Sequence, residues 1–324
     1  MGRPQEAFRI LRLGHCVLRV RDLSAARSFY VDVLGFVPAL EERDALSVRG
    51  ITDFDLWTLG LVRLDEPGLD HFALRVEYSD DLDALEELHR TLGVPVTRVE
   101  AGREPGQGEA LRVRTPDGHP VEFYHHMEQV PVYDDRGRVR LPMQSTHRFR
   151  GIPPMFIDHM NSRVEDPDAS LTYWRDRLRS SISEYTVRDG KTFAAWLRRQ
   201  RGTHDVAVVR STGPSLHHVA YHVGEPADVM RTADLLADAG FRAQIDFGPG
   251  RHGLSNAVFI YVIYVRDPSG NRLEISMGDY QRDLDAEPIR WEWEDYDEGG
   301  RLWWSPWYPA RFLETTPVNP SWPL

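Results

Sequence analysis

An internal repeat constrains the fold of this 324-residue chain more than any other feature. Three segments of the first half recur in the same order in the second half, at offsets of 144, 147 and 152 residues. The pairs are LGHCVLRV (13–20) with IDHMNSRV (157–164), LDHFALRV (69–76) with LHHVAYHV (216–223), and TPDGHPVEFY (115–124) with DPSGNRLEIS (267–276). Order and spacing are both preserved, which indicates two homologous halves.

Each half contains the same alternation of strands and helices. The alternating, β-rich segment 13–20 predicts a strand, Asp22 offers an N-cap oxygen to the helix that follows, and Gly35 ends that helix. Asp166 opens the equivalent helix of the second half, followed by a proline that suits the first helical position. The second unit of each half contains a further predicted helix, over 81–92 and 227–239. The pattern predicts two units rich in β-α-β structure in each half, four in all.

Composition along the chain predicts four regions. They are a first domain over 1–135, a polar and arginine-rich linker over 136–151, a second domain over 152–283 and a tail over 284–324. The tail holds six of the nine tryptophans, and it is rich in proline without a periodic pattern. Disordered tails are poor in aromatic residues, so we expect an irregular segment that packs over the second half.

The composition excludes several classes of function. Fifty Asp and Glu against 39 Lys and Arg give a formal charge of -11, which disfavours a nucleic-acid partner, because such binding is driven by basic side chains. A single cysteine, Cys16, forms no internal disulfide, and the first residues lack the apolar core of a signal peptide. The longest apolar run, 257–265, is far shorter than the ~20 residues that span a bilayer. We therefore expect a cytoplasmic protein without a membrane segment.

The repeat also places two histidines and one glutamate at matching positions in each half. The two sets are His15, His71 and Glu122, and His159, His218 and Glu274. Two imidazoles and one carboxylate on one face of a metal ion leave adjacent positions open, which is the arrangement of non-haem Fe(II) oxygenases. Because these residues lie near the ends of predicted strands, three strand ends are expected to converge on a metal ion.

The surroundings favour the second set as the active one. Asn161, His204, His252 and Tyr264 are able to transfer protons or donate hydrogen bonds there, whereas the first half has no equivalents of His204 and His252. A metal site depends on such neighbouring groups as well as on its ligands. Two interpretations of the first set stay open: a remnant of the duplication, or a second site for Zn(II), Mn(II) or Fe(II).

Longer motifs extend over most of the chain and carry a resemblance to a known family. They include LGHCVLRVRDL, DEPGLDHFALRV, KTFAAWL, GTHDVAVV, LHHVAYHV, GPGRHGLSNA, DPSGNRLEI and the tryptophan pair of the tail. In these motifs the chain resembles the type I extradiol ring-cleaving dioxygenases of the vicinal oxygen chelate superfamily, especially the catechol 2,3- and homoprotocatechuate 2,3-dioxygenases. The resemblance implies an α+β fold of two tandem vicinal-oxygen-chelate domains, each of two βαβββ modules. It also implies conversion of a catechol and O2 to a muconic semialdehyde-type product, and a homo-oligomer, often a tetramer.

The resemblance also implies roles for individual residues. The metal ion, Fe(II) or Mn(II), is held in this interpretation by His159, His218 and Glu274. The other implied positions are His204 as the acid–base histidine, Asn161 as a hydrogen-bonding amide, His252 as a channel histidine and Trp196 as a wall of the substrate pocket. Three tail residues are expected to form part of a lid that shields the metal pocket from water: Trp303, Trp304 and Trp307.

The active-site tyrosine has two candidates. Counting forward from the GPGRH segment gives Tyr261, whereas counting back from Glu274 gives Tyr264. Residues three apart in a regular strand point to opposite faces. We favour Tyr264, because a tight turn joins its strand rigidly to the strand of Glu274. By the same alternation, His217 is expected to point away from its neighbour His218.

The expected substrate differs from that of the homoprotocatechuate enzymes. Those enzymes carry an arginine before the GPGRH segment and an arginine pair before the Trp-Trp of the tail, whereas here the positions are Phe247 and Gly300-Arg301. A phenyl ring in place of a guanidinium removes a bidentate partner for a carboxylate. This departure implies a neutral or bulky catechol, with Phe247, Arg251 and Arg301 as candidate substrate contacts.

Other functions on the same scaffold stay open at this point. A glyoxalase-like isomerase or a keto-acid-dependent oxygenase needs the metal ligands, but not His204, His252 and Tyr264 together. A metal-free resistance protein that only binds a small molecule needs none of the metal ligands.

Overall fold

The computed structural model describes residues 8–143, 151–251, 260–296 and 309–322. The first half contains β1 (Ile10–Val20), α1 (Leu23–Arg27), η1 (Ser28–Val33), β2 (Val37–Glu41), β3 (Ala45–Arg49), β4 (Leu59–Arg63), β5 (Gly68–Val76), α2 (Asp81–Thr91), β6 (Val96–Val99), β7 (Ala110–Arg114) and β8 (Pro120–Tyr124). The second half contains β9 (Ile157–Val164), α3 (Pro167–Leu171), η3 (Thr172–Arg177), β10 (Ser181–Arg188), β11 (Lys191–Arg198), β12 (Val206–Arg210), β13 (Ser215–His222), α4 (Pro226–Asp238), η4 (Arg242–Gln244), β14 (Ile245–Arg251), β15 (Tyr261–Arg266) and β16 (Arg272–Met277). The tail adds β17 (Ile289–Glu292), α5 (Trp293–Asp295), η6 (Ala310–Leu313) and β18 (Thr316–Pro317).

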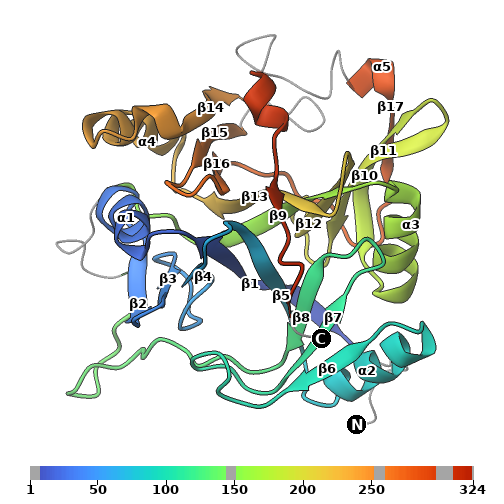
Figure 1. Cartoon of the computed structure of the whole chain (residues 1–324), viewed down its shortest axis with the longest axis horizontal. Coiled ribbons are helices and arrows are strands. Elements are labelled where there is room, and N and C mark those ends of the chain that lie inside the picture. Colours follow the sequence, from blue (N-terminus) through green and yellow to red (C-terminus); the bar gives the residue numbers. More distant parts are fainter. Residues whose placement is uncertain (1–7, 144–150, 252–259, 297–308, 323–324) are drawn as a thin grey trace.

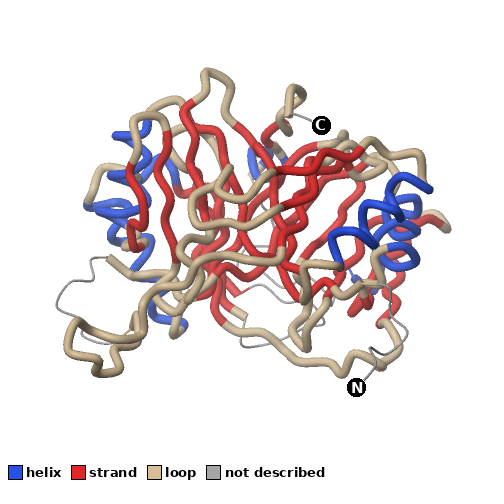
Figure 2. Tube along the Cα trace, turned by 90° about the horizontal axis from the view of Figure 1, so that it is seen from below, coloured by secondary structure: helices blue, strands red, loops and turns tan. Residues whose placement is uncertain are grey.

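Each half forms one mixed sheet in the middle of the molecule, with helices at the outer sides (Figure 1, Figure 2). The strand orders are β2-β3-β4-β1-β5-β8-β7-β6 and β14-β15-β16-β13-β9-β12-β11-β10-β17. In each sheet, two four-stranded modules join through an antiparallel central pair, β1 with β5 and β9 with β13. The first strand of each module is parallel to its last. This arrangement confirms the predicted α+β fold of four βαβββ modules, whereas the exact domain boundaries stay a prediction.

Local signals in the sequence set the ends of the helices. The Asp22 carboxylate accepts hydrogen bonds from the amides of Ser24 (2.8 Å) and Ala25 (3.1 Å) at the start of α1. Asp166 caps α3 in the same way. The helix that begins at α1 continues into the π-helical η1 and stops before Gly35, whose φ of 91° lies in the left-handed region that favours glycine.

The helices also join the two halves. Phe29 of η1 lies edge-on to Phe241 of the second half, with ring centroids 5.4 Å apart. On the other side of the molecule, His89 Nε2 of α2 lies 2.8 Å from the Tyr173 hydroxyl of η3. The buried core therefore runs continuously through both halves.

The tail follows a different path from the one expected. Its described end, 309–322, first lies over the second half, where Phe312 is buried, and β18 then pairs with β13. It continues to the first half, where Trp322 is 4% exposed and stacks on His71 with ring centroids 5.3 Å apart. The expectation that the tail packs over the second half was therefore incomplete, because its last described residues bind the first half. Three residues of the expected lid lie outside the described ranges: Trp303, Trp304 and Trp307.

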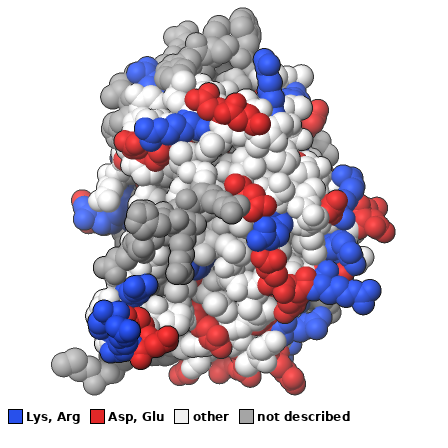
Figure 3. Space-filling view, turned by 90° about the vertical axis from the view of Figure 1, so that its left-hand side faces the viewer, with Lys and Arg blue, Asp and Glu red and all other residues white. Residues whose placement is uncertain are grey.

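Acidic and basic side chains are intermixed on the face shown in Figure 3, so the excess of acidic residues does not gather into one patch there. Within the described ranges, no helix has the length and apolar character needed to cross a membrane.

Candidate metal centre

Three neighbouring strands bring the predicted metal ligands of the second half together. His159 lies on β9, His218 on β13 and Glu274 on β16, and each is at most 5% exposed. The two Nε2 atoms are 3.1 Å apart, and Glu274 Oε2 lies 3.1 Å from His218 Nε2 and 3.6 Å from His159 Nε2. These three residues, called the metal triad below, surround a space of the size that one ion fills.

Hydrogen bonds behind each imidazole turn its Nε2 atom toward this shared space. His159 Nδ1 lies 2.7 Å from the Asp158 carboxylate, to which it donates. His218 Nδ1 lies 2.7 Å from His217 Nδ1, and His217 Nε2 lies 2.7 Å from the Phe312 carbonyl oxygen. Because a carbonyl only accepts, His217 donates through Nε2 and accepts the His218 proton at Nδ1. A chain of hydrogen bonds from the tail therefore fixes the tautomer of one ligand.

The expectation that His217 points away from His218 was wrong. The pairing of β13 with β9 contains a bulge between Leu216 and His218, which interrupts the alternation of the strand. Both histidines therefore line the same cavity. Burial, together with the positive charges of Arg163 and Arg272, lowers the pKa of His217 well below its usual value. The His217 ring is thus neutral, as the chain of hydrogen bonds requires.

The local charges give the two imidazoles of the triad different protonation states. Burial and the neighbouring His217 and His159 rings lower the pKa of His218 well below its usual value. Burial also opposes protonation of His159, but the carboxylates of Glu274 and Asp158 outweigh it and raise the pKa of His159 to about 10. A divalent cation competes with that proton for the same atoms.

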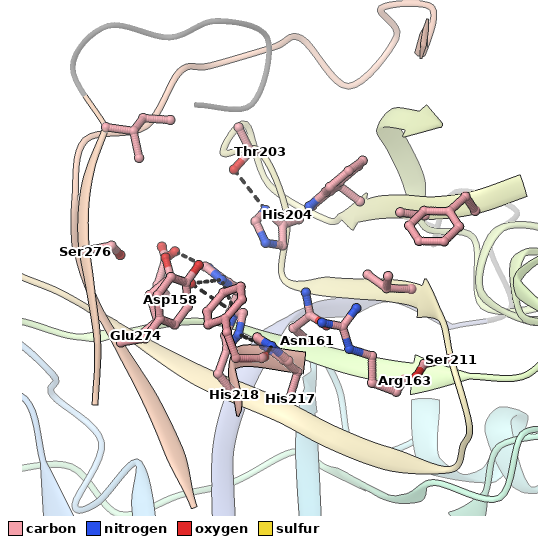
Figure 4. Close-up of a pocket in the computed structure, with 18 of the residues that line it drawn as sticks. Asp158, Asn161, Arg163, Thr203, His204, Ser211, His217, His218, Glu274 and Ser276 are labelled. Atoms are coloured by element: carbon pink, nitrogen blue, oxygen red, sulfur yellow. Dashed lines mark hydrogen bonds and ion pairs between the residues drawn. The ribbon is translucent and has the colours of Figure 1, made fainter. Parts of the chain in front are cut away.

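The metal triad forms part of the wall of a cavity of about 350 Å³ (Figure 4). Four rings, called the aromatic wall below, also line it: Phe193, Trp196, Trp293 and Tyr296. The remaining predicted residues found in the lining are Asn161, His204 and Tyr264. Of the residues predicted from the sequence, the structure therefore brings seven to one cavity: the metal triad, these three, and Trp196.

His204 lies between this cavity and a second one. Its ring centroid is 4.0 Å from that of His159, and its Nδ1 atom is 3.0 Å from the Thr203 hydroxyl. The second cavity, of about 320 Å³, extends to the first half, where Arg12 and Asp55 line it. Because His204 borders both cavities, it connects the metal triad with a polar space.

Asn161 and Tyr264 lie on two different strands of the sheet, and both line the cavity of the triad. Asn161 follows His159 by two positions on β9, and its Oδ1 atom has no hydrogen-bond partner among the described residues. Tyr264 on β15 is paired with Glu274 on β16, and burial and that carboxylate raise the pKa of Tyr264 well above its usual value. Tyr261 does not line the cavity.

Only part of the expected substrate contacts reach the cavity. Trp196 lines it, whereas Phe247 and Arg251 are not among its described lining residues, so their role as substrate contacts stays a prediction. They lie on β14, the edge strand of the sheet, and Phe312 packs against Phe247 (ring centroids 5.1 Å apart) and itself lines the cavity. Two further expected residues lie outside the described ranges: His252 and Arg301.

The cavity also contains residues that the sequence analysis missed. Arg163 lines it two positions after Asn161, so the alternation of β9 was a usable signal. Phe312 and Leu313 come from the tail, where no periodic pattern indicates which segment returns to the cavity.

The two histidines and the glutamate at the repeat positions of the first half also lie close together. His15, His71 and Glu122 lie on β1, β5 and β8, and one donor atom of each is within 4.8 Å of the others. Glu104, from the loop before β7, belongs to the same group. Sequence reasoning missed Glu104 because its loop is not one of the three repeated segments.

Comparison with known proteins agrees with this geometry. The model of the glyoxalase/bleomycin resistance protein/dioxygenase superfamily matches residues 12–123 and 156–275. A manganese-dependent 2,3-dihydroxybiphenyl 1,2-dioxygenase of Geobacillus genomosp. 3 is 32% identical over 303 residues, covering 92% of this chain and 94% of the relative. A metapyrocatechase of Geobacillus stearothermophilus is 27% identical over 321 residues, covering 96% and 95%. The anaerobic complex of homoprotocatechuate 2,3-dioxygenase from Brevibacterium fuscum with 3,4-dihydroxyphenylacetate matches with a TM-score of 0.86 at 32% identity, covering 98% of this chain and 96% of that one.

The two segments matched by the family model are the two halves of the repeat, and each contains one complete set of two histidines and a glutamate. The relatives match over nearly their full length, so the similarity includes both sheets. The chain therefore belongs to the glyoxalase/bleomycin resistance protein/dioxygenase superfamily and, within it, to the extradiol ring-cleaving dioxygenases.

Proposed function

We propose that this protein opens the ring of a substituted catechol with O2, to a muconic semialdehyde-type product, at one divalent metal ion held by the metal triad. The observation that carries the proposal is the convergence of two imidazole nitrogens and one carboxylate oxygen in the wall of a cavity lined by aromatic rings. We assign Fe(II) or Mn(II) to the site, because nitrogen and oxygen ligands of this kind suit both ions. The name of one relative includes manganese dependence, which supports Mn(II).

The donor set fits such an ion. Three protein ligands on one face leave room for both catechol oxygens and for O2. When bound, the ion supplies the charge that makes ionisation of a catechol hydroxyl accessible near neutral pH, and the redox capacity for chemistry with O2. The side chains of the cavity then have to bind the substrate, exclude water and move protons.

We assign proton transfer to His204. An imidazole titrates near neutral pH and both accepts and donates a proton in that range. The contact with Thr203 Oγ1 orients the ring, and the position between the two cavities gives His204 the substrate on one side and a polar space on the other. A proton taken from the catechol is thus held close to the site where the product needs it.

Tyr264 and Asn161 are suited to hold the oxygens of the substrate. The raised pKa of Tyr264 keeps its hydroxyl protonated, so this group donates a hydrogen bond to a catecholate oxygen. The Asn161 Oδ1 atom, without a partner among the described residues, accepts a hydrogen bond from a substrate hydroxyl. The two groups therefore favour a singly ionised catechol.

The aromatic wall supports a neutral, apolar substituent on the catechol. Its four rings offer apolar surface, and burial of such surface contributes roughly 25 cal/mol per Å². Arg163 in the same cavity is the feature that favours an acidic substituent instead. An acidic substituent would need the positive charge of Arg163, whereas a neutral substituent would not. Substitution of Arg163 therefore distinguishes the two classes of substrate.

A panel of catechols tests the substrate class. We expect kcat/KM to be at least tenfold higher for 3-phenylcatechol than for 3,4-dihydroxyphenylacetate, and Trp196→Ala to reduce that preference. A preference for the acid that disappears in Arg163→Gln would contradict the assignment of a neutral substrate.

Two other functions are less well supported. An isomerase or a keto-acid-dependent oxygenase on this scaffold has no need for His204, Tyr264 and Asn161 around the same three ligands. A protein that only binds a small molecule gains nothing from three ionisable groups held in contact and buried, because burial of such groups costs free energy. Turnover of a hemithioacetal or a keto acid, with no O2 uptake from any catechol, would favour these alternatives.

We also propose that the protein is a cytoplasmic homo-oligomer, in the form of a tetramer. The single cysteine is buried and free, which suits a reducing compartment. Sedimentation velocity distinguishes a tetramer from a monomer directly, since a tetramer has four times the mass of the 37.3 kDa chain.

A further inference from the structure

A second cluster of ionisable groups is buried in the first half, apart from the cavity of the metal triad. We call it the first-half cluster: His15, His71, Glu104 and Glu122. The two histidines and Glu122 are at most 1% exposed, and the Glu104 side chain is 14% exposed. Three members stand at the repeat positions of the metal triad, and Glu104 is an additional carboxylate.

The donor atoms of this cluster face one another. Glu104 Oε1 lies 3.2 Å from His71 Nε2, and Glu104 Oε2 lies 3.4 Å from His15 Nε2. Among the described residues, His71 Nε2, Glu104 Oε2 and both ring nitrogens of His15 have no hydrogen-bond partner of suitable geometry. A buried polar group that is left without a partner costs free energy. Several such atoms directed at one point indicate a ligand that they share.

Contacts behind the ligands orient them toward that point. The Asp70 carboxylate lies 2.8 Å from His71 Nδ1, so the Nε2 atom of that ring faces the cluster. Arg112 Nε and Gln107 Nε2 each donate to the Glu122 carboxylate at 2.6 Å. Carboxylate–histidine contacts and hydrogen-bonded carboxylates of this kind are typical of metal sites.

The charges around the cluster favour a cation. Asp70, Glu104 and Glu122 are three carboxylates, and Arg112 contacts two of them, Glu104 at 2.9 Å and Glu122 at 2.6 Å. A guanidinium and a divalent ion together balance three carboxylates while both imidazoles stay neutral, which is the form of histidine that binds metals.

The cluster is covered by aromatic rings. The Trp57 ring lies 4.3 Å from the His15 ring, and the Trp322 ring stacks on His71 at 5.3 Å. Structural metal sites are closed and use four protein ligands, whereas catalytic sites keep a position open. Glu104 as a fourth potential ligand, together with the covering rings, thus distinguishes this cluster from the metal triad.

We propose that the first-half cluster binds a divalent transition-metal ion, with zinc as the best match, at a structural site separate from the catalytic one. Four nitrogen and oxygen donors suit Zn(II) in a tetrahedral arrangement. The ion also stabilises the end of the tail, because Trp322 packs on one ligand and Asn319 Nδ2 donates to Asp70 Oδ1 at 2.6 Å.

The zinc content of the full-length protein tests this proposal. After loading with Zn(II) and dialysis, we expect two ions per chain in the wild type and one in His218→Ala, which retains only the first-half cluster. The double variant His71→Ala/His218→Ala should bind none. Zinc should raise the Tm of His218→Ala and leave that of the double variant unchanged.

Two results would overturn the proposal: a His218→Ala protein that binds no zinc, or a double variant that still binds one ion. His89→Gln is the matched control, since it changes another buried histidine of the first half outside the cluster and should retain its zinc. If His71→Ala does not fold, anomalous scattering at the zinc edge from wild-type crystals decides the question by a peak, or no peak, between His15 and His71. None of these readouts measures ring cleavage, so the outcome is independent of the proposed function.

Discussion

At the scale of single residues, the protonation states of the two triad imidazoles depend on neighbouring side chains as well as on the triad itself. The Asp158 carboxylate orients His159, and the neutral His217 ring orients His218 through a proton shared between two Nδ1 atoms. The three residues of the metal triad could be proposed as ligands from the sequence, because the same residue types repeat in both halves. The role of His217 could not, because a bulge reverses the direction of a side chain without leaving a signal in the sequence pattern.

His204 provides the first prediction. His204→Phe should retain the metal ion, because His204 is not a member of the triad, but should lower kcat by roughly 10²- to 10³-fold through loss of proton transfer. Metal content and the rate of product formation are measured on the same preparation. Thr203→Val, which removes the contact to Nδ1 together with the hydroxyl's hydrogen bond to Asp279, should have a smaller effect. Full activity in His204→Phe would exclude a role for this residue in proton transfer.

His217 provides the second prediction, as a positioning residue. His217→Phe removes the acceptor for the His218 Nδ1 proton, so the affinity for Mn(II) should fall about 10- to 100-fold, which is typical of such outer contacts. Titration followed by electron paramagnetic resonance measures that affinity. His217→Gln can still donate and accept hydrogen bonds and should recover part of the loss. Equal affinities in the wild type and His217→Phe would show that the chain of hydrogen bonds is not needed.

At the scale of elements, the helices were the most predictable part of the chain and the tail the least. Asp22, Asp166 and Gly35 act where the sequence places them, because caps and left-handed glycines depend on a few neighbouring residues only. The path of the tail depends on distant partners such as His71 and β13, which leave no periodic signal in its own sequence.

The N-cap of α3 is the element whose contribution can be measured most simply. Asp166→Ala should lower the free energy of unfolding by about 1 kcal/mol, because the side chain accepts hydrogen bonds from the amides of Asp168 and Ala169 at 3.1 and 3.3 Å. Asp166→Asn should keep most of that energy. Urea denaturation gives both values, with the exposed neighbour change Glu165→Ala as control. A loss as large in the control as in Asp166→Ala would contradict the assignment.

At the scale of the whole molecule, the duplication appears again in the contacts between the halves. His119 Nε2 donates to the Ser215 carbonyl at 3.1 Å, and Asn271, at the equivalent position of the second half, donates to the Arg19 carbonyl at 2.9 Å. Two homologous halves with two units each could be predicted from the repeat in the sequence. Their mode of packing could not, because it depends on these single polar contacts and on rings such as Phe29.

His119 makes the stability of this interface depend on pH. Burial, helped by Arg114, lowers the pKa of His119 from 6.5 to about 4, although the bond to the Ser215 carbonyl opposes the shift. Protons therefore bind the unfolded chain more readily, and the stabilisation is fully present above pH 6.5 and is lost as the pH falls toward 4, by roughly 3 kcal/mol. His119→Asn, which copies Asn271, should remove this part of the pH dependence. If the free energy of unfolding changes by the same amount in the wild type and in His119→Asn between pH 7 and pH 4, this role of His119 is contradicted.

The central claim is that the metal triad supports ring cleavage of a catechol, and the most direct test is O2 uptake by the reconstituted protein. Apoprotein loaded with Fe(II) or Mn(II) should consume one O2 for each molecule of 3-phenylcatechol and form a yellow product in the same amount. His218→Ala and Glu274→Gln, treated identically, should do neither. Absence of O2 uptake by the metal-loaded wild type with every catechol tried, or undiminished turnover in His218→Ala, would contradict the claim.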